Sequence, residues 1–302
     1  THARIEEGKY AGMGFAKIAT KVKEIRENNP NVLVLDAGDT FHGQTIATLV
    51  KGESVVKVMN EIGYDAMASG NHDFNYGQER LLELSNMTDF PILAANVVKE
   101  DGTEFLKPYT IKEVGALKVG IFGLATPDTT YTTHPKNVEG LIFRDPIVVS
   151  EEMVTELKEK TDIIIALAHI GVDESSSVTS IEIAEAVEGI DIIVDGHSHT
   201  TLPEGMKVND TLIVQAGEHD KNLGLVDLIY QDGEIKSLSA SILTKDEAAE
   251  LADDETVVAL VADIKAENEK VTSVVVANTD IHLDGERAQV RTGETNLGNL
   301  IA

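Results

Sequence analysis

Cysteine and tryptophan are absent from the 302 residues of the sequence. Without cysteine, the chain can form no disulfide bond, no thiolate metal site and no cysteine nucleophile. Aromatic residues make up only 4% of the chain, so the core must be built mostly from aliphatic side chains. The longest apolar run, Ile163 to Ala168, falls well short of the roughly 18 residues that a membrane-spanning helix needs. We therefore predict no membrane span within this chain.

Basic residues are also scarce. The 25 lysines and arginines face 52 aspartates and glutamates, which gives a formal net charge of −27. A surface this negative repels nucleic-acid polymers and anionic membranes. A small phosphate ester is not excluded, because bound metal ions can reverse the local field. The predicted partner is accordingly a small molecule and not a nucleic-acid polymer.

Helical and strand-like patterns alternate along the first two-thirds of the chain. Apolar residues from Phe15 to Ile25 recur at helical spacing, and those from Val55 to Ile62 form a second helical face that Gly63 ends. Short aliphatic runs predict buried strands at Val32–Leu35, Tyr64–Ala68, Leu117–Leu124, Asp162–Ala168 and Ile190–Val194. Continuous apolar runs are typical of strands covered on both faces.

The pattern changes after Thr211. Thr211–Ala216 and Leu223–Tyr230 read as strands without a helix between them, and the turn after Tyr230 allows a hairpin that returns from Ile235. We expect this part to be antiparallel. Lys245–Lys270 is polar and mostly helical, and Val271–Ala277 again resembles a strand.

Polar residues follow four of the predicted strands directly. They are Asp39 after the first, Asn71, His72 and Asp73 after the second, His169 after a third, and His197 and His199 after a fourth. Sites in α/β proteins form outside the carboxyl ends of strands, so these side chains can converge. Imidazole nitrogen, carboxylate and amide oxygen are ligands for divalent metals, and glycines beside them (Gly38, Gly70 and Gly196) let the backbone turn sharply.

A single histidine after a strand is more often structural than a metal ligand, which is the reading for His169 taken alone. The His-Ser-His triplet at His197 is a stronger signal. The combined pattern is the strongest signal, because it includes four of the nine histidines. The sequence therefore predicts a metal centre.

The same motifs resemble those of a known family. Gly-Asp-x-x-x-Gly (38–43), Gly-Asn-His-Asp (70–73), Ala-His (168–169) and Gly-His-Ser-His (196–199) are similar to the calcineurin-like metallophosphoesterases. The chain is most similar to the bacterial 5'-nucleotidase branch of this family, at residues 126–128, 134–135, 145–146, 285–287 and 291–300. That branch includes 2',3'-cyclic-nucleotide phosphodiesterases and nucleotide-sugar hydrolases.

This resemblance implies an α/β fold, a four-layer αββα sandwich of two mixed sheets. It implies a dimetal metallophosphoesterase domain at 1–245 without its first strand, a linker helix at 246–270, and the start of a truncated C-terminal nucleotide-binding domain at 271–302. The family opens with Asp-x-His, of which Thr1-His2 matches the last two positions. The leading Asp would precede Thr1, so we expect the first metal to bind less tightly than the second.

The resemblance also implies roles for individual residues. One divalent metal is expected on His2, Asp39 and His199, and the second on Asp39, Asn71, His169 and His197, with Asp39 bridging. Manganese and zinc both suit such ligands. His72 is expected to be the catalytic histidine, with Asp73 as its partner. The histidines at 42, 134, 219 and 282 match no ligand position.

The implied function is metal-dependent hydrolysis of nucleotide phosphate esters by a metal-activated water, releasing nucleoside and phosphate as a 5'-nucleotidase does. An extracytoplasmic location (secreted, periplasmic or cell-surface) is implied as well. Four alternatives stay open: a 2',3'-cyclic-nucleotide phosphodiesterase, a nucleotide-sugar hydrolase, a sulfur-ester hydrolase on the same fold, and a non-catalytic surface binding protein with structural metals. A zinc peptidase is disfavoured because the sequence has no His-Glu-x-x-His motif.

Overall fold

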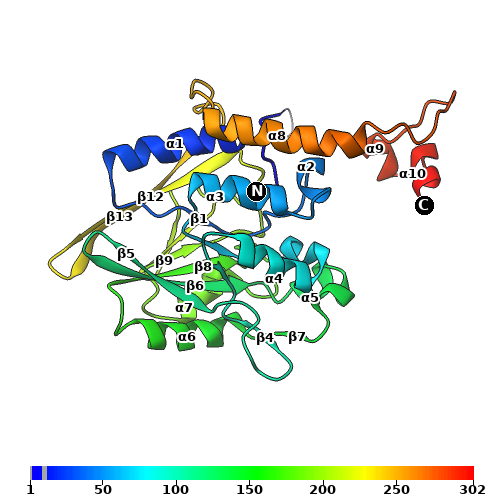
Figure 1. Ribbon diagram of the computed structural model, residues 1–302. Helices are drawn as coiled ribbons and strands as arrows, with labels where there is room; N and C mark the ends of the chain where they lie inside the picture. The colour runs from blue at the N-terminus through cyan, green and yellow to red at the C-terminus, as the bar shows by residue number, and fades with distance from the viewer. Residues whose placement is uncertain (1, 9–11) are drawn as a thin grey trace. The chain divides into compact units, whose positions relative to one another are not determined.

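The structure is a computed structural model that describes residues 2–8 and 12–302. It forms two compact units, Thr1–Lys265 and Ala266–Ala302. The division into a catalytic domain (1–245), a linker (246–270) and the start of a nucleotide-binding domain (271–302) stays a prediction. Figure 1 shows the order of the helices and strands along the chain.

In the described residues the helices are α1 (Gly14–Asn28), α2 (Thr45–Thr48), α3 (Glu53–Ile62), α4 (Gln78–Met87), α5 (Thr129–Thr132), α6 (Pro146–Leu157), α7 (Ser180–Ala186), α8 (Glu255–Thr272), α9 (Arg287–Val290) and α10 (Asn296–Ile301), with 3-10 helices η1 (Asn71–Tyr76) and η2 (Pro135–Val138). The strands are β1 (Leu35–Asp36), β2 (Ala66–Ala68), β3 (Ile92–Leu93), β4 (Val97–Lys99), β5 (Tyr109–Val114), β6 (Leu117–Ala125), β7 (Leu141–Phe143), β8 (Ile163–His169), β9 (Ile192–Val194), β10 (Met206–Val208), β11 (Thr211–Val214), β12 (Asn222–Gln231) and β13 (Glu234–Thr244).

The largest sheet has six strands in the order β10-β11-β9-β8-β6-β5. Its four inner strands run parallel, and β10 and β5 pair antiparallel at its two edges. All seven residues of β8 are buried, as the continuous apolar run predicted for a strand covered on both faces.

A second, parallel sheet of three strands, β1-β2-β3, packs on this large sheet. The core between the two sheets is aliphatic and includes Ala68 and Leu93 from one side and Ile121 and Leu167 from the other. Helices α1, α3 and α4 cover the outer face of the small sheet, and α6 and α7 cover the outer face of the large one (Figure 1). This order of layers confirms the predicted αββα architecture.

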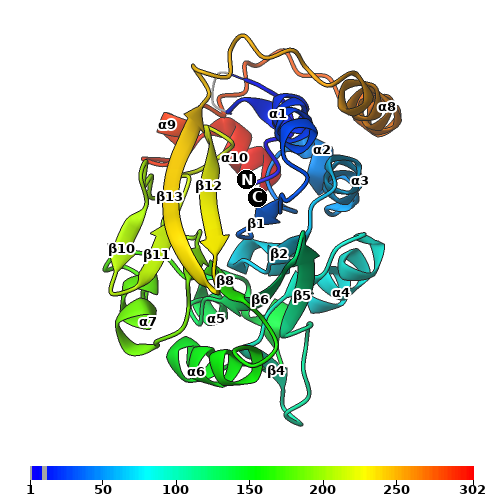
Figure 2. The same ribbon diagram turned by 90° about the vertical axis from the view of Figure 1, so that its left-hand side faces the viewer.

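The β12–β13 hairpin is long and antiparallel, as the turn signal predicted (Figure 2). Its side chains, including Leu228 and Leu238, pack on the core between the sheets, but its strands form a separate two-stranded sheet. The hairpin therefore joins this layer by side-chain packing and not by a hydrogen-bonded ladder. The second predicted mixed sheet is thus divided into a parallel sheet and a hairpin.

Two local predictions were wrong. Strand β11, in the segment predicted to be antiparallel, pairs parallel with β9 as well as antiparallel with β10. Val271–Ala277 forms no strand: α8 extends to Thr272, and Val276 beyond it is 93% exposed. Its β-branched residues favour a strand, but a strand is stable only when it pairs and packs.

The second unit consists of the end of α8, the short helices α9 and α10, and the segments that join them. Within it, the Thr295 side chain caps α10, and Asn296 donates a hydrogen bond to the backbone oxygen of His282. No helix among the described residues is long and apolar enough to cross a membrane.

Candidate metal centre

The predicted site residues come from the carboxyl ends of strands in both stacked sheets. Asp39 follows β1 and Asn71 follows β2 in the small sheet. His169 ends β8, and His197 and His199 follow β9, in the large sheet. The site therefore forms where the carboxyl edges of the two sheets meet.

Asp39 lies at the centre of this group. Its Oδ2 atom is 3.2 Å from His169 Nε2 and 3.8 Å from His2 Nε2. The latter nitrogen is in turn 3.1 Å from His199 Nε2. Because one carboxylate faces histidines on two sides, it is placed to bridge two cations.

The remaining two predicted ligands lie on the His169 side of Asp39. His197 Nδ1 is 3.1 Å from Asn71 Oδ1, and the rings of His169 and His197 are 5.1 Å apart. The structure thus brings all six predicted ligands together in two groups that share Asp39.

Four of these six residues have a left-handed backbone. The φ angles are 53° for His2, 57° for Asp39, 70° for His197 and 55° for His199. Such a conformation costs a non-glycine residue on the order of 1–3 kcal/mol and clusters at functional sites. The ligand loops are therefore held in a shape that local preference alone does not favour.

Glycines allow the close approach of the first two loops. Gly38 has φ +90°, and a Cβ atom on it would lie 2.6 Å from the backbone nitrogen of Gly70. A Cβ atom on Gly70 would lie 2.3 Å from Asp39 Oδ1. Any larger residue would push Asp39 out of place, which agrees with the role expected for these glycines.

Asp73 holds the same two loops together. Its carboxylate is buried and accepts hydrogen bonds of 2.8–3.0 Å from the backbone N–H groups of Asp39, Thr40, Phe41 and Gly70. Burial, together with the charge of Asp39, raises the pKa of Asp73 to about 6, although these hydrogen bonds oppose the shift. The predicted pairing of Asp73 with the His72 ring is not formed, because both carboxylate oxygens face backbone amides of the two loops.

Asp195 plays the corresponding part on the other sheet. This buried carboxylate accepts hydrogen bonds from the backbone N–H groups of Ile170, Gly171 and Gly196 and from the side chains of Ser180 and Gln215. It therefore joins the loop after His169 to the loop that carries His197. Sequence reasoning missed this role, although Asp195 stands inside the Asp-Gly-His-Ser-His segment.

The His169–Asp39 pair is strongly polarised. Burial alone would lower the pKa of His169, but the adjacent Asp39 carboxylate outweighs it and raises that pKa to about 9. Burial would raise the pKa of Asp39, but His169 holds it well below its usual range. The Asp39 carboxylate therefore stabilises positive charge at the buried His169 ring.

Two of the other predicted ligands, both histidines, stay neutral. Burial lowers the pKa of His2 to about 3, and burial together with the nearby His169 lowers the pKa of His197 to about 4. Neutral imidazoles keep a lone pair free for a metal ion.

These residues fit divalent metal ions. The buried Nε2 atom of His169 makes no hydrogen bond, although it faces Asp39. Its other nitrogen, Nδ1, lies 2.6 Å from the backbone oxygen of Ala37, which fixes the ring as outer partners of metal-bound histidines do. The nitrogen and oxygen donors around one carboxylate suit zinc or manganese.

His72 lies at the edge of the group. One ring nitrogen of His72 is within 4.8 Å of ligand atoms of His2 and Asp39. Its backbone N–H donates to Asp39 Oδ1 at 2.7 Å, and its Nδ1 atom is 2.9 Å from the Asn75 side-chain nitrogen. Its ring partner is therefore Asn75, a residue that the sequence did not single out.

Three more residues lie near the centre, although the sequence analysis assigned none of them to it. Glu218 Oε2 lies 3.1 Å from His199 Nδ1 and 3.5 Å from His219 Nδ1. The His219 ring is 5.3 Å from that of His2, and His42 stacks at 6.1 Å on His72. Glu218 and His219 follow β11, so the same strand-end signal could have found them. His134, by contrast, caps η2, and His282 lies in the second unit.

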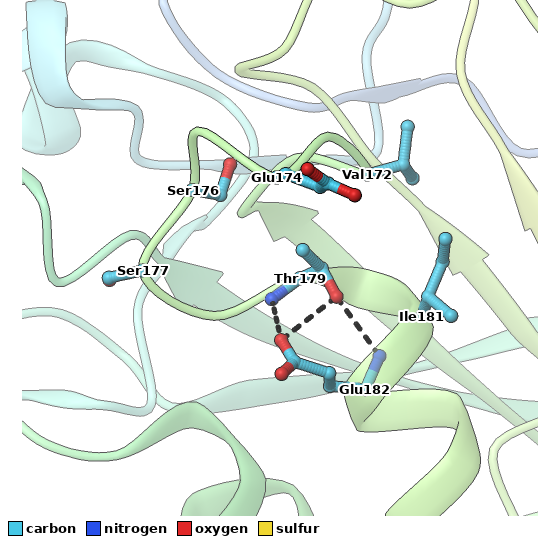
Figure 3. A pocket seen from close by; sticks show the side chains of 7 residues that line it. All are labelled: Val172, Glu174, Ser176, Ser177, Thr179, Ile181 and Glu182. Carbon is cyan, nitrogen blue, oxygen red and sulfur yellow. Dashed lines mark hydrogen bonds between the residues drawn. The ribbon is translucent and has the colours of Figure 1, made fainter.

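A pocket adjoins the loop that leaves His169 (Figure 3). It is lined by Val172, Glu174, Ser176, Ser177, Thr179, Ile181 and Glu182. Thr179 and Glu182 form the capping box that starts α7, so this part of the wall is held in place by hydrogen bonds. None of the predicted ligands lines it.

Comparison with known proteins gives a consistent result. The calcineurin-like phosphoesterase family model matches residues 1–201. A snake venom 5'-nucleotidase from Gloydius brevicauda is 36% identical, over 99% of this chain and 55% of its own. The trifunctional nucleotide phosphoesterase protein YfkN of Bacillus subtilis (strain 168) is 33% identical, over 100% of this chain and 22% of its own.

One solved structure with a similar fold is named for a different reaction. Sulfate thiohydrolase SoxB from Thermus thermophilus has a TM-score of 0.78 and 27% identity, covering 86% of this chain and 48% of that chain. This chain thus spans about half or less of the length of each of these three proteins.

Proposed function

Because the chain belongs to the calcineurin-like phosphoesterase family, we propose that it hydrolyses phosphate esters of nucleotides and releases nucleoside and phosphate. Two relatives support this substrate class, since one is named a 5'-nucleotidase and the other a nucleotide phosphoesterase. The observation that carries the proposal is Asp39, buried between two histidine groups with His72 beside it.

We assign the ligands as the family resemblance implies. Asp39, His2 and His199 hold one ion, and Asp39, Asn71, His169 and His197 hold the other, with manganese or zinc as the metals. When bound, such ions supply positive charge to the phosphoryl group and activate the attacking water. Asp39 keeps the two groups of ligands at a fixed separation, and the clamp formed by Asp73 keeps Asp39 in place.

His72 is the proposed catalytic residue. Its Nε2–H donates a hydrogen bond to the transferring phosphoryl group, or its proton to the leaving oxygen of the nucleoside. Help of this kind typically contributes about 10²–10⁴-fold. Asp73 takes no part in this transfer, because its carboxylate is occupied by backbone amides.

A second candidate function is hydrolysis of a sulfur ester. The likeness to SoxB favours it, since that protein is named a sulfate thiohydrolase. Cyclic-nucleotide phosphodiesterase and nucleotide-sugar hydrolase activities remain further alternatives at the same centre. A binding protein with structural metals is disfavoured, because it has no use for a histidine fixed beside the ligands.

We also propose an extracytoplasmic location. One relative is a venom protein, which is an extracellular setting. The absence of cysteine is compatible with a location on either side of a membrane, so this proposal rests on the venom relative. Fractionation of the source cells with an antibody to the chain tests it, and a product found only in the cytoplasm would contradict it.

The function is tested by phosphate release from a substrate panel. Metal-stripped protein is reloaded with manganese or zinc and given nucleoside monophosphates, a 2',3'-cyclic nucleotide, a nucleotide sugar and a sulfur ester. We expect metal-dependent release of phosphate from the monophosphates, and no release by the Asp39→Asn variant. Turnover of the sulfur ester alone would favour the second candidate, and no turnover by the metal-loaded protein would favour a binding protein.

A further inference from the structure

One turn of the chain supplies a ligand to each of the two metal positions. His197 and His199 follow β9 and are separated only by Ser198. His197 lies against Asn71 in one group of ligands, whereas His199 lies against His2 in the other. Both histidines have a left-handed backbone, with φ 70° and 55°, which costs on the order of 1–3 kcal/mol for each. The turn therefore needs contacts that hold it in this shape.

The two ends of the turn are fixed to the end of β11. The backbone N–H of Asp195 donates to the backbone oxygen of Val214 at 2.9 Å, and the N–H of Leu202 donates to that of Gln215 at 2.9 Å. Between these anchors lies the Gln215 side chain, which directly follows β11 and is only 4% exposed. The middle of the turn, where the two histidines stand, faces this side chain.

The hydrogen bonds of Gln215 allow one orientation of its amide. The backbone N–H of Thr200 lies 2.5 Å from Gln215 Oε1, and an N–H can only donate, so the amide oxygen faces the turn. Gln215 Nε2 then faces Asp195 Oδ2, an acceptor, at 3.4 Å. The amide oxygen also accepts the Ser198 hydroxyl at 3.0 Å. Because an amide oxygen cannot donate, the single hydroxyl proton of Ser198 is committed to this bond.

The hydroxyl of Ser198 has no capacity left. Its oxygen accepts the backbone N–H of Val172 at 3.2 Å and, since its own proton is committed, the hydroxyl of Thr200 at 2.9 Å. A hydroxyl offers one donor and two acceptor positions, and all three are filled here. Val172 lies in the loop that leaves His169. The residue between the two histidines thus joins their turn to Gln215 on one side and to that loop on the other.

We propose that Gln215, acting through Ser198, is a positioning residue that keeps this turn ordered before any metal binds. It thereby removes an ordering cost that the two metal positions would otherwise share. The proposal rests on the ligand assignment made under the proposed function. Neither Gln215 nor Ser198 is a ligand in that assignment, so both act through His197 and His199.

A turn released from Gln215 has to become ordered when the first ion binds. The affinity for that ion falls in proportion to the fraction of protein in which the turn is ordered. The second ion finds the turn already ordered, so its affinity does not change. Two separately damaged positions would behave differently, because both binding steps would then weaken.

Gln215→Met tests this coupling, because methionine has a similar length but no amide. Zinc binding is followed by competition with a chelator of known affinity. We expect the first binding step to weaken about 10- to 100-fold, as on loss of other outer partners of metal ligands, and the second step to stay the same. Ser198→Ala breaks the same hydrogen bond from its other end and should give the same pattern.

Thr211→Val is the matched control on the same strand. Thr211 is 3% exposed, and its hydroxyl donates to the backbone oxygen of Ile190 at 2.7 Å, at the other end of β11. The change removes one buried hydrogen bond of similar length without touching the turn. Both zinc-binding steps should therefore remain as in the unaltered protein.

Hydrogen exchange in the metal-free protein reports the turn itself. The backbone N–H of Ser198 donates to the backbone oxygen of Gly196 inside the turn, an acceptor that Gln215→Met leaves in place. We expect this N–H to exchange faster in the variant and to regain protection when zinc is added. Unchanged exchange would contradict the proposal.

The zinc titration can also contradict it. No weakening in Gln215→Met, weakening of both steps alike, or equal weakening in Thr211→Val would each overturn the proposal. Zinc binding without phosphate release from any ester would remove the proposed function and leave this comparison decisive. An unaltered protein that binds no zinc would overturn both.

Discussion

The Asp73 carboxylate accepts the backbone N–H of Asp39 at 2.9 Å. The same carboxylate accepts the N–H of Gly70, so it joins the loop after β1 to the loop after β2. Asp39 is thereby held in a left-handed backbone conformation, with φ 57°, in which its side chain faces both groups of histidines. We therefore expect position 73 to be needed for metal binding and not for proton transfer.

Asp73→Ala should unfold more easily and lose metal. The change leaves four buried backbone N–H groups without their acceptor, which should cost at least about 3 kcal/mol in the free energy of unfolding. Denaturant titration and elemental analysis measure the two effects. A variant with unchanged stability and metal content but slow turnover would instead support pairing with His72.

His72→Ala, by contrast, should keep its metal ions but lose activity. We expect kcat to fall about 10²–10⁴-fold, because the donor to the phosphoryl group is lost. Metal content should stay nearly the same, since His72 lies beside the ligands and its Nδ1 atom faces Asn75. Loss of an ion from this variant in elemental analysis would identify His72 as a ligand.

Glu218→Gln should weaken one metal position selectively. His199 Nε2 faces His2 while its Nδ1 atom faces Glu218 at 3.1 Å, so the carboxylate orients the ring from outside. Loss of such a partner typically lowers metal affinity about 10- to 100-fold. Calorimetric titration with zinc would measure this loss against Glu234→Gln, an exposed control. Equal affinities in the two variants would contradict the role of Glu218.

Asp220 should make stability depend on pH. It is 6% exposed, its Oδ2 atom has no hydrogen-bond partner, and burial, with Asp36 nearby, raises its pKa to about 7. Between the unfolded pKa of about 4 and pH 7, the folded state holds a proton that the unfolded state has released, so stability falls as pH rises.

The Asp220→Asn variant removes this loss. We expect it to lose less stability than the unaltered protein between pH 5 and pH 8, by up to about 3 kcal/mol, because roughly two pH units lie between pH 5 and the folded pKa and each is worth about 1.4 kcal/mol. Thermal midpoints at the two pH values measure the difference, with exposed Asp227→Asn as the control. Identical pH slopes in all three proteins would show that Asp220 does not titrate in this range.

The convergence of the candidate ligands could be predicted because their signal is local. Asp39, Asn71 and His169 each follow or end a short apolar strand, and the layered fold brings such strand ends together. The contacts around His72 gave no such signal. Thr133 reaches Asn75 across 58 positions of the sequence, and a contact of that range has no pattern in a single sequence.

The expected contact between Asp73 and the His72 ring is absent for a related reason. Adjacent in sequence to His72, Asp73 was expected to be its partner, but η1 turns the two side chains apart and brings Asn75 to the ring. The layers of the fold were implied by the family resemblance, and the alternation of helix and strand agreed with them. The pairing of β11 with β9 was not, because strand direction depends on the path of the chain between them.

Anomalous scattering from crystals soaked in manganese tests the central claim most directly. We expect two manganese peaks, roughly 3.5–4 Å apart as in two-metal sites, that share Asp39 as a ligand. One peak should contact His2 and His199, and the other Asn71, His169 and His197. No peak at Asp39, or a peak that His169 and His197 do not contact, would contradict the assignment of this cluster as the metal centre.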